Sequence, residues 1–150
     1  MDLRRRFQPN TALATHRWTV RLAAEFGHAD ITPELRALVG ESGVQTGVLT
    51  VQMLGSTGAI TTIEYESGAL SDLRRALDLI APVDADYAHN ARWGDGNGFS
   101  HVRSALLKTS LSLPVVEGEV AVGTWQQVVA LNLDNRERMR ELIAVLVGSA

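Results

Sequence analysis

The final third of the chain consists almost entirely of strand-like sequence, and this feature constrains the fold most. Residues 119–133 and 138–147 are rich in Val, Leu and Ile, and a polar turn at residues 134–137 joins them. No helix-like segment separates the two. The chain therefore lacks the regular alternation of strands and helices that builds a doubly wound α/β sheet.

Further strands are predicted where β-branched and aromatic residues recur, at residues 15–22, 47–54, 59–65 and 110–116. The second and third of these flank the break Gly55-Ser56-Thr57-Gly58, so we expect them to be neighbouring strands. Residues 117–119 are expected to form a hairpin turn before the C-terminal strands.

Three segments have the apolar spacing of a helix. The clearest is residues 68–81, which Pro82 ends. In residues 32–39, Thr32 is the expected N-cap and Pro33 the first helical residue. The third segment is residues 99–107. About seven strands and two or three helices predict an α+β fold. We expect one domain over residues 1–150, a β-sandwich-like arrangement of mixed sheets, with residues 1–12 as a flexible tail.

Composition excludes several classes of function. The 150 residues have a formal net charge of -3, so the broad positive field of non-specific nucleic-acid binding is missing. The absence of cysteine excludes disulfides, thiolate nucleophiles and Cys-ligated metals. The longest apolar stretches fall far short of the roughly 20 residues that span a bilayer, and no apolar signal segment follows the N-terminal arginines. We expect a cytoplasmic protein with no nucleic-acid or membrane partner.

A long polar loop after Pro82 contains the residues most able to bind a ligand. His89 and His101 bracket a cluster of carboxylate, amide and glycine residues: Asp95, Asn97 and Gly98 among them. Imidazole and carboxylate groups suit zinc, manganese or iron, and glycines let backbone amides approach a phosphate. The pattern alone is equally consistent with a solvated loop that has one capping histidine.

Three other groups are weaker candidates. Glu64 interrupts a β-branched run, where it could be a general base or a metal ligand or could point to solvent. Ser56 and Thr57 lie in a glycine-flanked turn that could bind an anion, although it lacks the lysine of a P-loop. In the segment Gly123-Thr124-Trp125-Gln126, strand alternation would place Thr124 and Gln126 on one face, facing a ligand, and Trp125 on the other.

Several ordered blocks of sequence together resemble a known family. The most C-terminal block comprises Ser110, Leu113, Val115 and Gly118, followed by Gly123-Thr124-Trp125-Gln126 and Val128. The upstream blocks are Glu41-Ser42-Gly43 with Gly47, the whole of residues 55–64, Asp86-Tyr87-Ala88-His89, and residues 96–101. These blocks are similar to those of the YjbQ-like family, described as secondary thiamine-phosphate synthase enzymes. The resemblance covers residues 15–148.

The resemblance implies two packed sheets, assembled as a homotrimer with sites near subunit boundaries. It also implies a transferase that joins hydroxymethylpyrimidine pyrophosphate to thiazole phosphate. The expected partner is thus a small phosphorylated metabolite. On this basis His89 and His101 are expected to hold a divalent metal (Mg, Mn or Zn) and, with Glu64, to be catalytic. The expected substrate-binding residues are Ser56, Thr57, Asp95, Asn97, Gly98, Thr124 and Gln126.

Two positions depart from the family pattern. Gly55 stands where many members have a third histidine, so a three-histidine metal site cannot be assembled from that pattern. Lys108 replaces a glycine and could alter a turn or place a cation near the site. Two alternatives to the synthase therefore stay open: a metal-dependent hydrolase or lyase acting on a phosphorylated metabolite, and a non-catalytic trimeric anion-binding protein.

Overall fold

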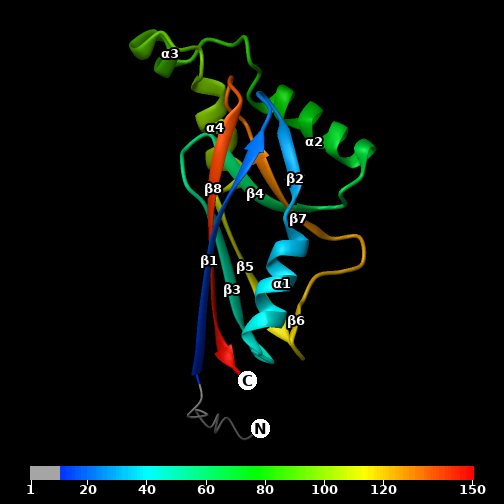
Figure 1. Ribbon diagram of the computed structural model, residues 1–150. Helices are drawn as coiled ribbons and strands as arrows, with labels where there is room; N and C mark the ends of the chain where they lie inside the picture. The colour runs from blue at the N-terminus through cyan, green and yellow to red at the C-terminus, as the bar shows by residue number, and fades with distance from the viewer. Residues whose placement is uncertain (1–10) are drawn as a thin grey trace, which may run out of the picture.

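Eight strands and four helices make up the described part of the chain, residues 11–150 of a computed structural model (Figure 1). The expected N-terminal tail lies outside this part except for Thr11 and Ala12, which belong to the first strand. In chain order the elements are β1 (Thr11–Leu22), β2 (Gly27–Asp30), α1 (Thr32–Ser42), β3 (Thr46–Met53), β4 (Gly58–Ile63), α2 (Ser67–Ile80), α3 (Ala88–Trp93), α4 (Gly98–Leu107), β5 (Ser110–Val116), β6 (Glu119–Val120), β7 (Gln127–Asn132) and β8 (Arg138–Ser149).

The strands form two antiparallel sheets, which confirms the α+β expectation. The larger has the order β1-β8-β3-β5-β6 and the smaller the order β2-β7-β4. Strand β8 is an inner strand of the larger sheet: it pairs along its length with β1 on one side and, from Leu142 to Ser149, with β3 on the other. The turn at residues 117–119 joins β5 and β6, as predicted, with Glu117 and Gly118 both at positive φ.

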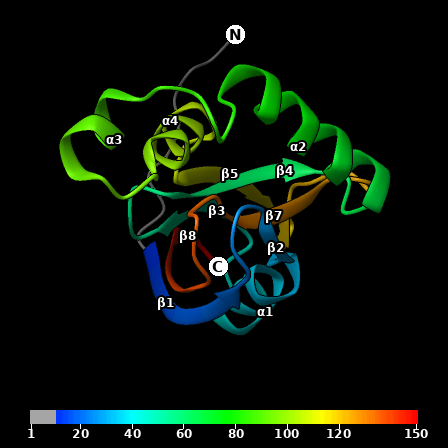
Figure 2. The same ribbon diagram turned by 90° about the horizontal axis from the view of Figure 1, so that it is seen from above.

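Two apolar cores lie on opposite faces of the smaller sheet. Val128 and Ala130 of β7 pack into the core shared with the larger sheet, whereas Val129 and Leu131 pack toward α2. Because β7 is buried on both faces, its sequence is a continuous apolar run rather than an alternating one. Figure 2 shows α2, α3 and α4 on one side of the sheets and α1 on the other.

The expectation that the strands on either side of Gly55 are neighbours is wrong. β3 belongs to the larger sheet and β4 to the smaller, where β4 pairs with β7. Gly58, Ala59 and Ile60 are all buried, so the start of β4 must be packed on both faces. The smaller sheet provides this environment, because it has an apolar core on each face. Gly55, at a φ of 113°, lies in the connection between the two sheets.

The expected continuous strand at residues 119–133 is also wrong. β6 ends at Val120 and β7 begins at Gln127, and a turn in which Gln126 N donates to the Gly123 carbonyl separates them. Alternation along a strand therefore cannot place Thr124 and Gln126 together. Trp125, at 74% exposed, is not a core residue.

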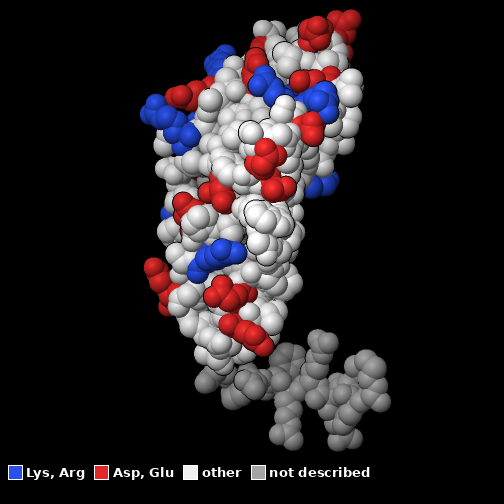
Figure 3. All heavy atoms as spheres, turned by 90° about the vertical axis from the view of Figure 1, so that its right-hand side faces the viewer, with Lys and Arg blue, Asp and Glu red and all other residues white. Residues whose placement is uncertain are grey.

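Two local expectations about helices need correction as well. Thr32 is not the N-cap of α1: Ile31 precedes the helix, and Thr32 Oγ1 instead accepts a hydrogen bond of 2.8 Å from Val128 N. The polar loop after Pro82 contains the short helix α3. None of the helices within residues 11–150 has the length and apolar character needed to cross a bilayer. On the face in Figure 3, acidic and basic side chains are interspersed.

Candidate functional site

His89 and His101 come together, as the sequence predicted for a site around the polar loop. His89 lies on α3 and His101 on α4, and their ring centroids are 4.4 Å apart. His89 Nδ1 is 3.2 Å from Asp95 Oδ1, within ion-pair distance. The direction of approach does not suit a hydrogen bond, so the buried Nδ1 has no hydrogen-bond partner among the described residues. His89 Nδ1 is therefore an unsatisfied polar atom beside the Asp95 carboxylate.

Asp95, Asn97 and Gly98 hold the two helices in this arrangement. The Asp95 carboxylate accepts a hydrogen bond from Asn97 N, and the buried Asn97 side chain accepts hydrogen bonds from Ser100 Oγ and Asn135 N. Gly98 N donates to Asn90 Oδ1 at 2.8 Å. In this structure the Asn97 amide oxygen and the Gly98 N–H are therefore already engaged with protein groups.

One face of His101 lines a pocket of about 370 Å³ at the end of α4. A volume in this range suits a small metabolite. The lining includes two basic residues and three hydroxyl groups but no carboxylate: Gly55, Ser56, His101, Ser104, Ala105, Lys108 and Thr109. The structure therefore brings Ser56 to His101, as the anion-binding hypothesis required, and adds Lys108.

Thr57, expected to bind substrate, is buried in a network of charged residues. Its hydroxyl donates to Asp134 Oδ2 at 2.8 Å and accepts from Arg140 Nη2 at 2.7 Å. Arg140 also donates to the Asn132 side chain, and Arg138 Nε donates to Asp134 Oδ2 at 3.1 Å. These contacts occupy the hydroxyl of Thr57, which therefore supports the turn that carries Ser56.

Burial and neighbouring groups shift the pKa values of Asp134 and Arg140 in this network. Burial raises the pKa of Asp134, but the hydrogen bond from Thr57 and the charge of Arg138 outweigh it and hold the pKa below its ordinary value. Burial lowers the pKa of the Arg140 guanidinium, and the Asp134 charge opposes that shift. Both groups are charged at neutral pH.

Sequence reasoning missed this network, although a signal existed. In β8 the residues Leu142, Ala144 and Leu146 are buried and alternate with outward-facing ones. Arg140 continues the inward-facing series and is itself 6% exposed. A charged residue in the apolar phase of a strand is rare unless it is paired, so strand alternation could have identified it.

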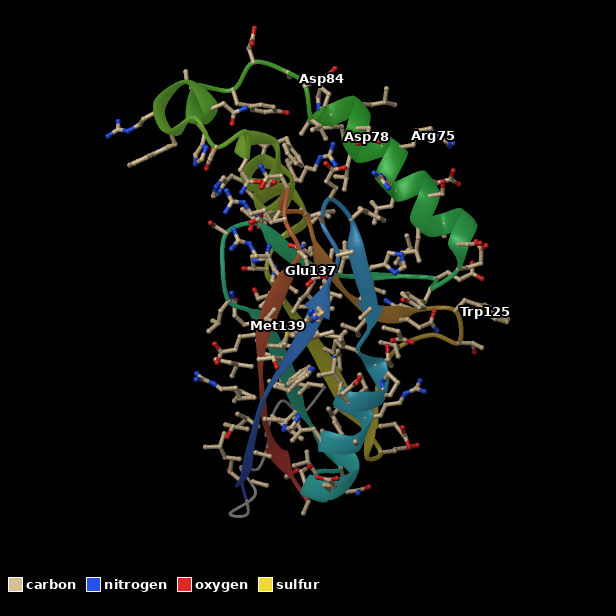
Figure 4. All side chains as sticks on the ribbon, turned by 45° about the horizontal axis from the view of Figure 1, so that its top comes forward. Arg75, Asp78, Asp84, Trp125, Glu137 and Met139 are labelled. Carbon is tan, nitrogen blue, oxygen red and sulfur yellow. The ribbon has the colours of Figure 1, made fainter. Side chains whose placement is uncertain are left out.

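Glu64, Thr124 and Gln126 do not join the histidine pocket. Glu64 and Thr124 line a separate cavity of about 350 Å³ beside Trp125. Gln126 Nε2 donates to Thr62 Oγ1 at 3.3 Å, and its side-chain oxygen accepts from Gly123 N. In Figure 4 Trp125 projects from the β6–β7 loop on the side of the molecule opposite α3. Within one chain, the predicted site residues therefore form two separate groups.

A cavity of about 420 Å³ between β2 and α2 contains none of the predicted residues. Phe26 and Leu70 form its apolar wall, and the His28 ring, within 3.0 Å of the Tyr65 hydroxyl, adds a polar edge. Its volume exceeds that of the histidine pocket, so volume does not select between the two. Its lining also includes Arg74, Ser67 and Ser71, so basic and hydroxyl groups are present in both cavities. The histidine pocket is distinguished by His101 and Ser56, two of the residues predicted from the sequence.

The residues present do not fit a resident metal ion. No three His, Asp or Glu side chains within residues 11–150 are arranged to hold one. Protein metal sites with a catalytic role supply three ligands as a rule. His89 and His101 provide two imidazoles, and Gly55, at the position where the resemblance implies a third histidine in many family members, has no side chain.

Comparison with known proteins gives consistent matches. Residues 16–149 match the family model described as UPF0047 protein YjbQ-like. A UPF0047 protein of Methanothermobacter thermautotrophicus is 40% identical over 116 residues, 77% of this chain and 80% of that protein. The UPF0047 protein YjbQ of Salmonella typhimurium is 32% identical over 120 residues, 79% of this chain and 86% of that protein.

Solved structures agree with these sequence matches. A crystal structure of a YbjQ-like protein of unknown function from Sulfolobus solfataricus has a TM-score of 0.88 at 26% identity, covering 93% of this chain and 100% of that one. A protein of the YjbQ/UPF0047 family from Clostridium acetobutylicum has a TM-score of 0.78 at 25% identity, covering 86% and 97%.

Proposed function

Because the chain belongs to the YjbQ-like UPF0047 family, we propose that it joins hydroxymethylpyrimidine pyrophosphate to thiazole phosphate. In this alkyl transfer a carbon–oxygen bond to pyrophosphate breaks, and a carbon–nitrogen bond to the thiazole ring forms. Pyrophosphate leaves with the bonding electron pair, and thiamine phosphate is the product. The reaction requires stabilisation of the departing anion and a fixed orientation of two reactants more than it requires a strong base.

The observation that carries this proposal is that Lys108, His101 and Ser56 line one pocket, to which no carboxylate of residues 11–150 of the same chain contributes. A departing pyrophosphate needs hydrogen-bond donors and positive charge at the place where its negative charge develops. His101 and Lys108 offer both, and the Ser56 hydroxyl adds a donor. No step in this proposal uses a resident metal, because the donor set does not fit one; magnesium enters only with the pyrophosphate substrate.

The second group of predicted residues is part of the proposal through assembly. We propose a homotrimer in which Glu64, Thr124 and Gln126 of one protomer complete the pocket at His101 of its neighbour. Glu64 would orient a ring nitrogen, and Thr124 and Gln126 would hydrogen-bond the substrate. The separation of the two groups within one chain motivates this arrangement.

The test is formation of thiamine phosphate from the two phosphorylated precursors with magnesium present. We expect turnover by the native protein and a loss of about 100-fold in His101→Ala, the scale of removing one positioned donor or acid–base group. His16→Ala is the matched control, because His16 stacks on Trp18 in β1 rather than lining this pocket, and it should retain full turnover.

Two outcomes would contradict the proposal in different ways. Equal turnover in the native protein and His101→Ala would remove His101 from the reaction. No turnover in the native protein would overturn the synthase assignment. The non-catalytic anion-binding trimer would then be the better assignment, because the pocket is basic and lacks a three-ligand metal set. The metal-dependent hydrolase or lyase is less favoured, since the same donor set would have to activate a metal-bound water.

A further inference from the structure

We propose that the pocket at His101 binds the phosphate group of its ligand directly through Lys108, which takes the place of a resident metal ion. The proposal rests on the proposed function only for the chemical class of the ligand, a phosphate or pyrophosphate ester. Lys108 is the only lysine in the sequence, and it lies in the wall of this pocket. A lysine ammonium binds phosphate as a compact point charge.

The backbone of Lys108 has a conformation that side chains other than glycine rarely adopt. Its φ is 74° and its ψ is 156°, a region populated essentially by glycine alone. Strain of this kind persists only where the surrounding structure imposes it, and it is concentrated at functional sites. A lysine at this position is therefore unfavourable for the fold, so its presence calls for a compensating role.

Hydrogen bonds to both sheets impose this conformation. Lys108 N donates to the Ser104 carbonyl at 2.8 Å, and the Lys108 carbonyl accepts from Ile60 N at 3.1 Å in the smaller sheet. The next carbonyl, of Thr109, accepts from Met53 N at 2.8 Å in the larger sheet. The backbone is thus fixed where the chain passes from α4 into β5.

A second positive charge lies behind the wall of the pocket at Gly55. The Arg140 side chain is 7% exposed, and its Nε and Nη2 atoms are hydrogen-bonded. Its Nη1 makes no hydrogen bond within residues 11–150 and is 3.1 Å from the position that a Cβ would take at Gly55. A histidine at position 55 would therefore crowd the guanidinium. Gly55 removes a potential metal ligand and at the same time leaves room for Arg140.

These observations describe one arrangement for an anion. Within one chain, the lining carries Lys108 and His101 with the hydroxyls of Ser56 and Thr109, and no carboxylate of residues 11–150 lines it. The positive charge that a metal would supply in a three-histidine site comes here from side chains of the protein.

Calorimetric titration of metal-free protein with inorganic pyrophosphate tests the proposal. We expect binding by the native chain, a loss of at least about tenfold in Lys108→Met, and near-native affinity in Lys108→Arg, since arginine keeps the charge. Arg75→Met is the control, because it removes an exposed cation that pairs with Asp72 on α2. Equal affinity of the native protein and Lys108→Met, or pyrophosphate binding that requires a divalent metal ion bound to the protein beforehand, would overturn the proposal.

A stability measurement separates the role of the charge from that of the backbone. Lys108→Gly relieves the strained conformation, so it should raise the melting temperature by about 2–6 °C while it loses pyrophosphate affinity. Lys108→Met keeps the strain and should melt close to the native protein. Loss of stability in Lys108→Gly would show that Lys108 holds the fold rather than the ligand.

The binding and turnover results distinguish this proposal from the synthase assignment. Pyrophosphate affinity that depends on Lys108, without formation of thiamine phosphate, supports the anion site and removes the synthase. Thiamine phosphate formation that is unchanged in Lys108→Met supports the synthase and removes the role of Lys108. A single-lysine chain also allows a direct readout: after ¹³C-methylation, Lys108 should give one lysine NMR signal, distinct from that of the methylated α-amino group, and this signal should shift on addition of pyrophosphate.

Discussion

At the scale of single residues, the buried Asp134 and Arg140 both hydrogen-bond Thr57, the residue after Ser56. Asp134 accepts hydrogen bonds from Thr57 and Arg138, and Arg140 donates to the Thr57 carbonyl at 3.0 Å. Removing one partner of a buried pair leaves the other charge without compensation, which costs about 3–5 kcal/mol. The carboxylate should therefore matter more for stability than any exposed acid of the chain.

Asp134→Asn should lower the free energy of unfolding at pH 7 by about 3 kcal/mol. Because the folded-state pKa of Asp134 lies below its ordinary value, its stabilising contribution is present above the ordinary Asp range and is lost as the pH falls through the folded pKa. The stability difference between native and variant should thus shrink as the pH falls from about 5 toward the folded pKa. Urea unfolding across this range measures it.

Asp72→Asn provides the comparison for this experiment. Asp72 pairs with Arg75 at 2.7 Å on the exposed face of α2. Exposed pairs contribute about 0–1 kcal/mol, so this variant should unfold nearly like the native protein at every pH. A native-to-Asp134→Asn difference that stays constant from pH 7 to pH 3 would contradict the assigned role of Asp134.

At the scale of elements, the contact between α4 and the segment before α3 decides whether the two histidines meet. A Cβ at Gly98 would lie 2.4 Å from Tyr87 Cβ and 2.7 Å from Tyr87 Cγ. Tyr87 is itself fixed, because its hydroxyl donates to the Pro82 carbonyl at 2.7 Å. The missing side chain at Gly98 therefore allows α3 and α4 to approach closely enough for His89 to reach His101.

Gly98→Ala should destabilise the protein by about 1–3 kcal/mol through overpacking and should reduce the activity or anion affinity assigned to His101. Gly40→Ala is the matched control, since no atom lies within 4 Å of its added Cβ in α1. Alanine favours a helix over glycine, so this variant should be unchanged or more stable by up to about 1 kcal/mol. Thermal unfolding of both variants checks the prediction, and equal effects would refute it.

At the scale of the whole molecule, the outer face of the larger sheet presents a row of exposed apolar side chains. Leu13, Val147, Val48 and Pro114 lie opposite one another on β1, β8, β3 and β5. Leu13 is 69% exposed and Val48 52%. Exposed apolar rows of this kind favour association, and the proposed homotrimer would cover this one.

Light scattering of the native protein should give three times the chain mass of 16.2 kDa. Val48→Lys places a charge in the middle of the row and should shift the mass toward one chain. Leu79→Lys is the control: Leu79 is 80% exposed on α2, away from this face, and its change should leave the assembly intact. A native monomer, or an unaltered mass in Val48→Lys, would reject this interface.

The sequence predicted several elements well because their signals are local. The apolar spacing that ends at Pro82 predicts α2 to within a residue at each end, and α4 and β5 follow their predicted ranges closely. The polar loop with its two histidines also came together as expected. In each case the deciding interactions join residues close in the chain, so periodicity, proline and glycine carry enough information.

Local sequence patterns were enough to predict the α+β class, the main helices and the polar loop that carries His89 and His101. They could not predict that β3 and β4 lie in different sheets, that Thr57 hydrogen-bonds Asp134, or that Glu64 is separated from His101. The tertiary structure also placed Lys108 in the pocket and Arg140 behind it. These outcomes depend on contacts between residues far apart in the chain, which local sequence patterns do not contain. Packing of the whole molecule decides which sheet an inner strand joins and which side chains line a pocket.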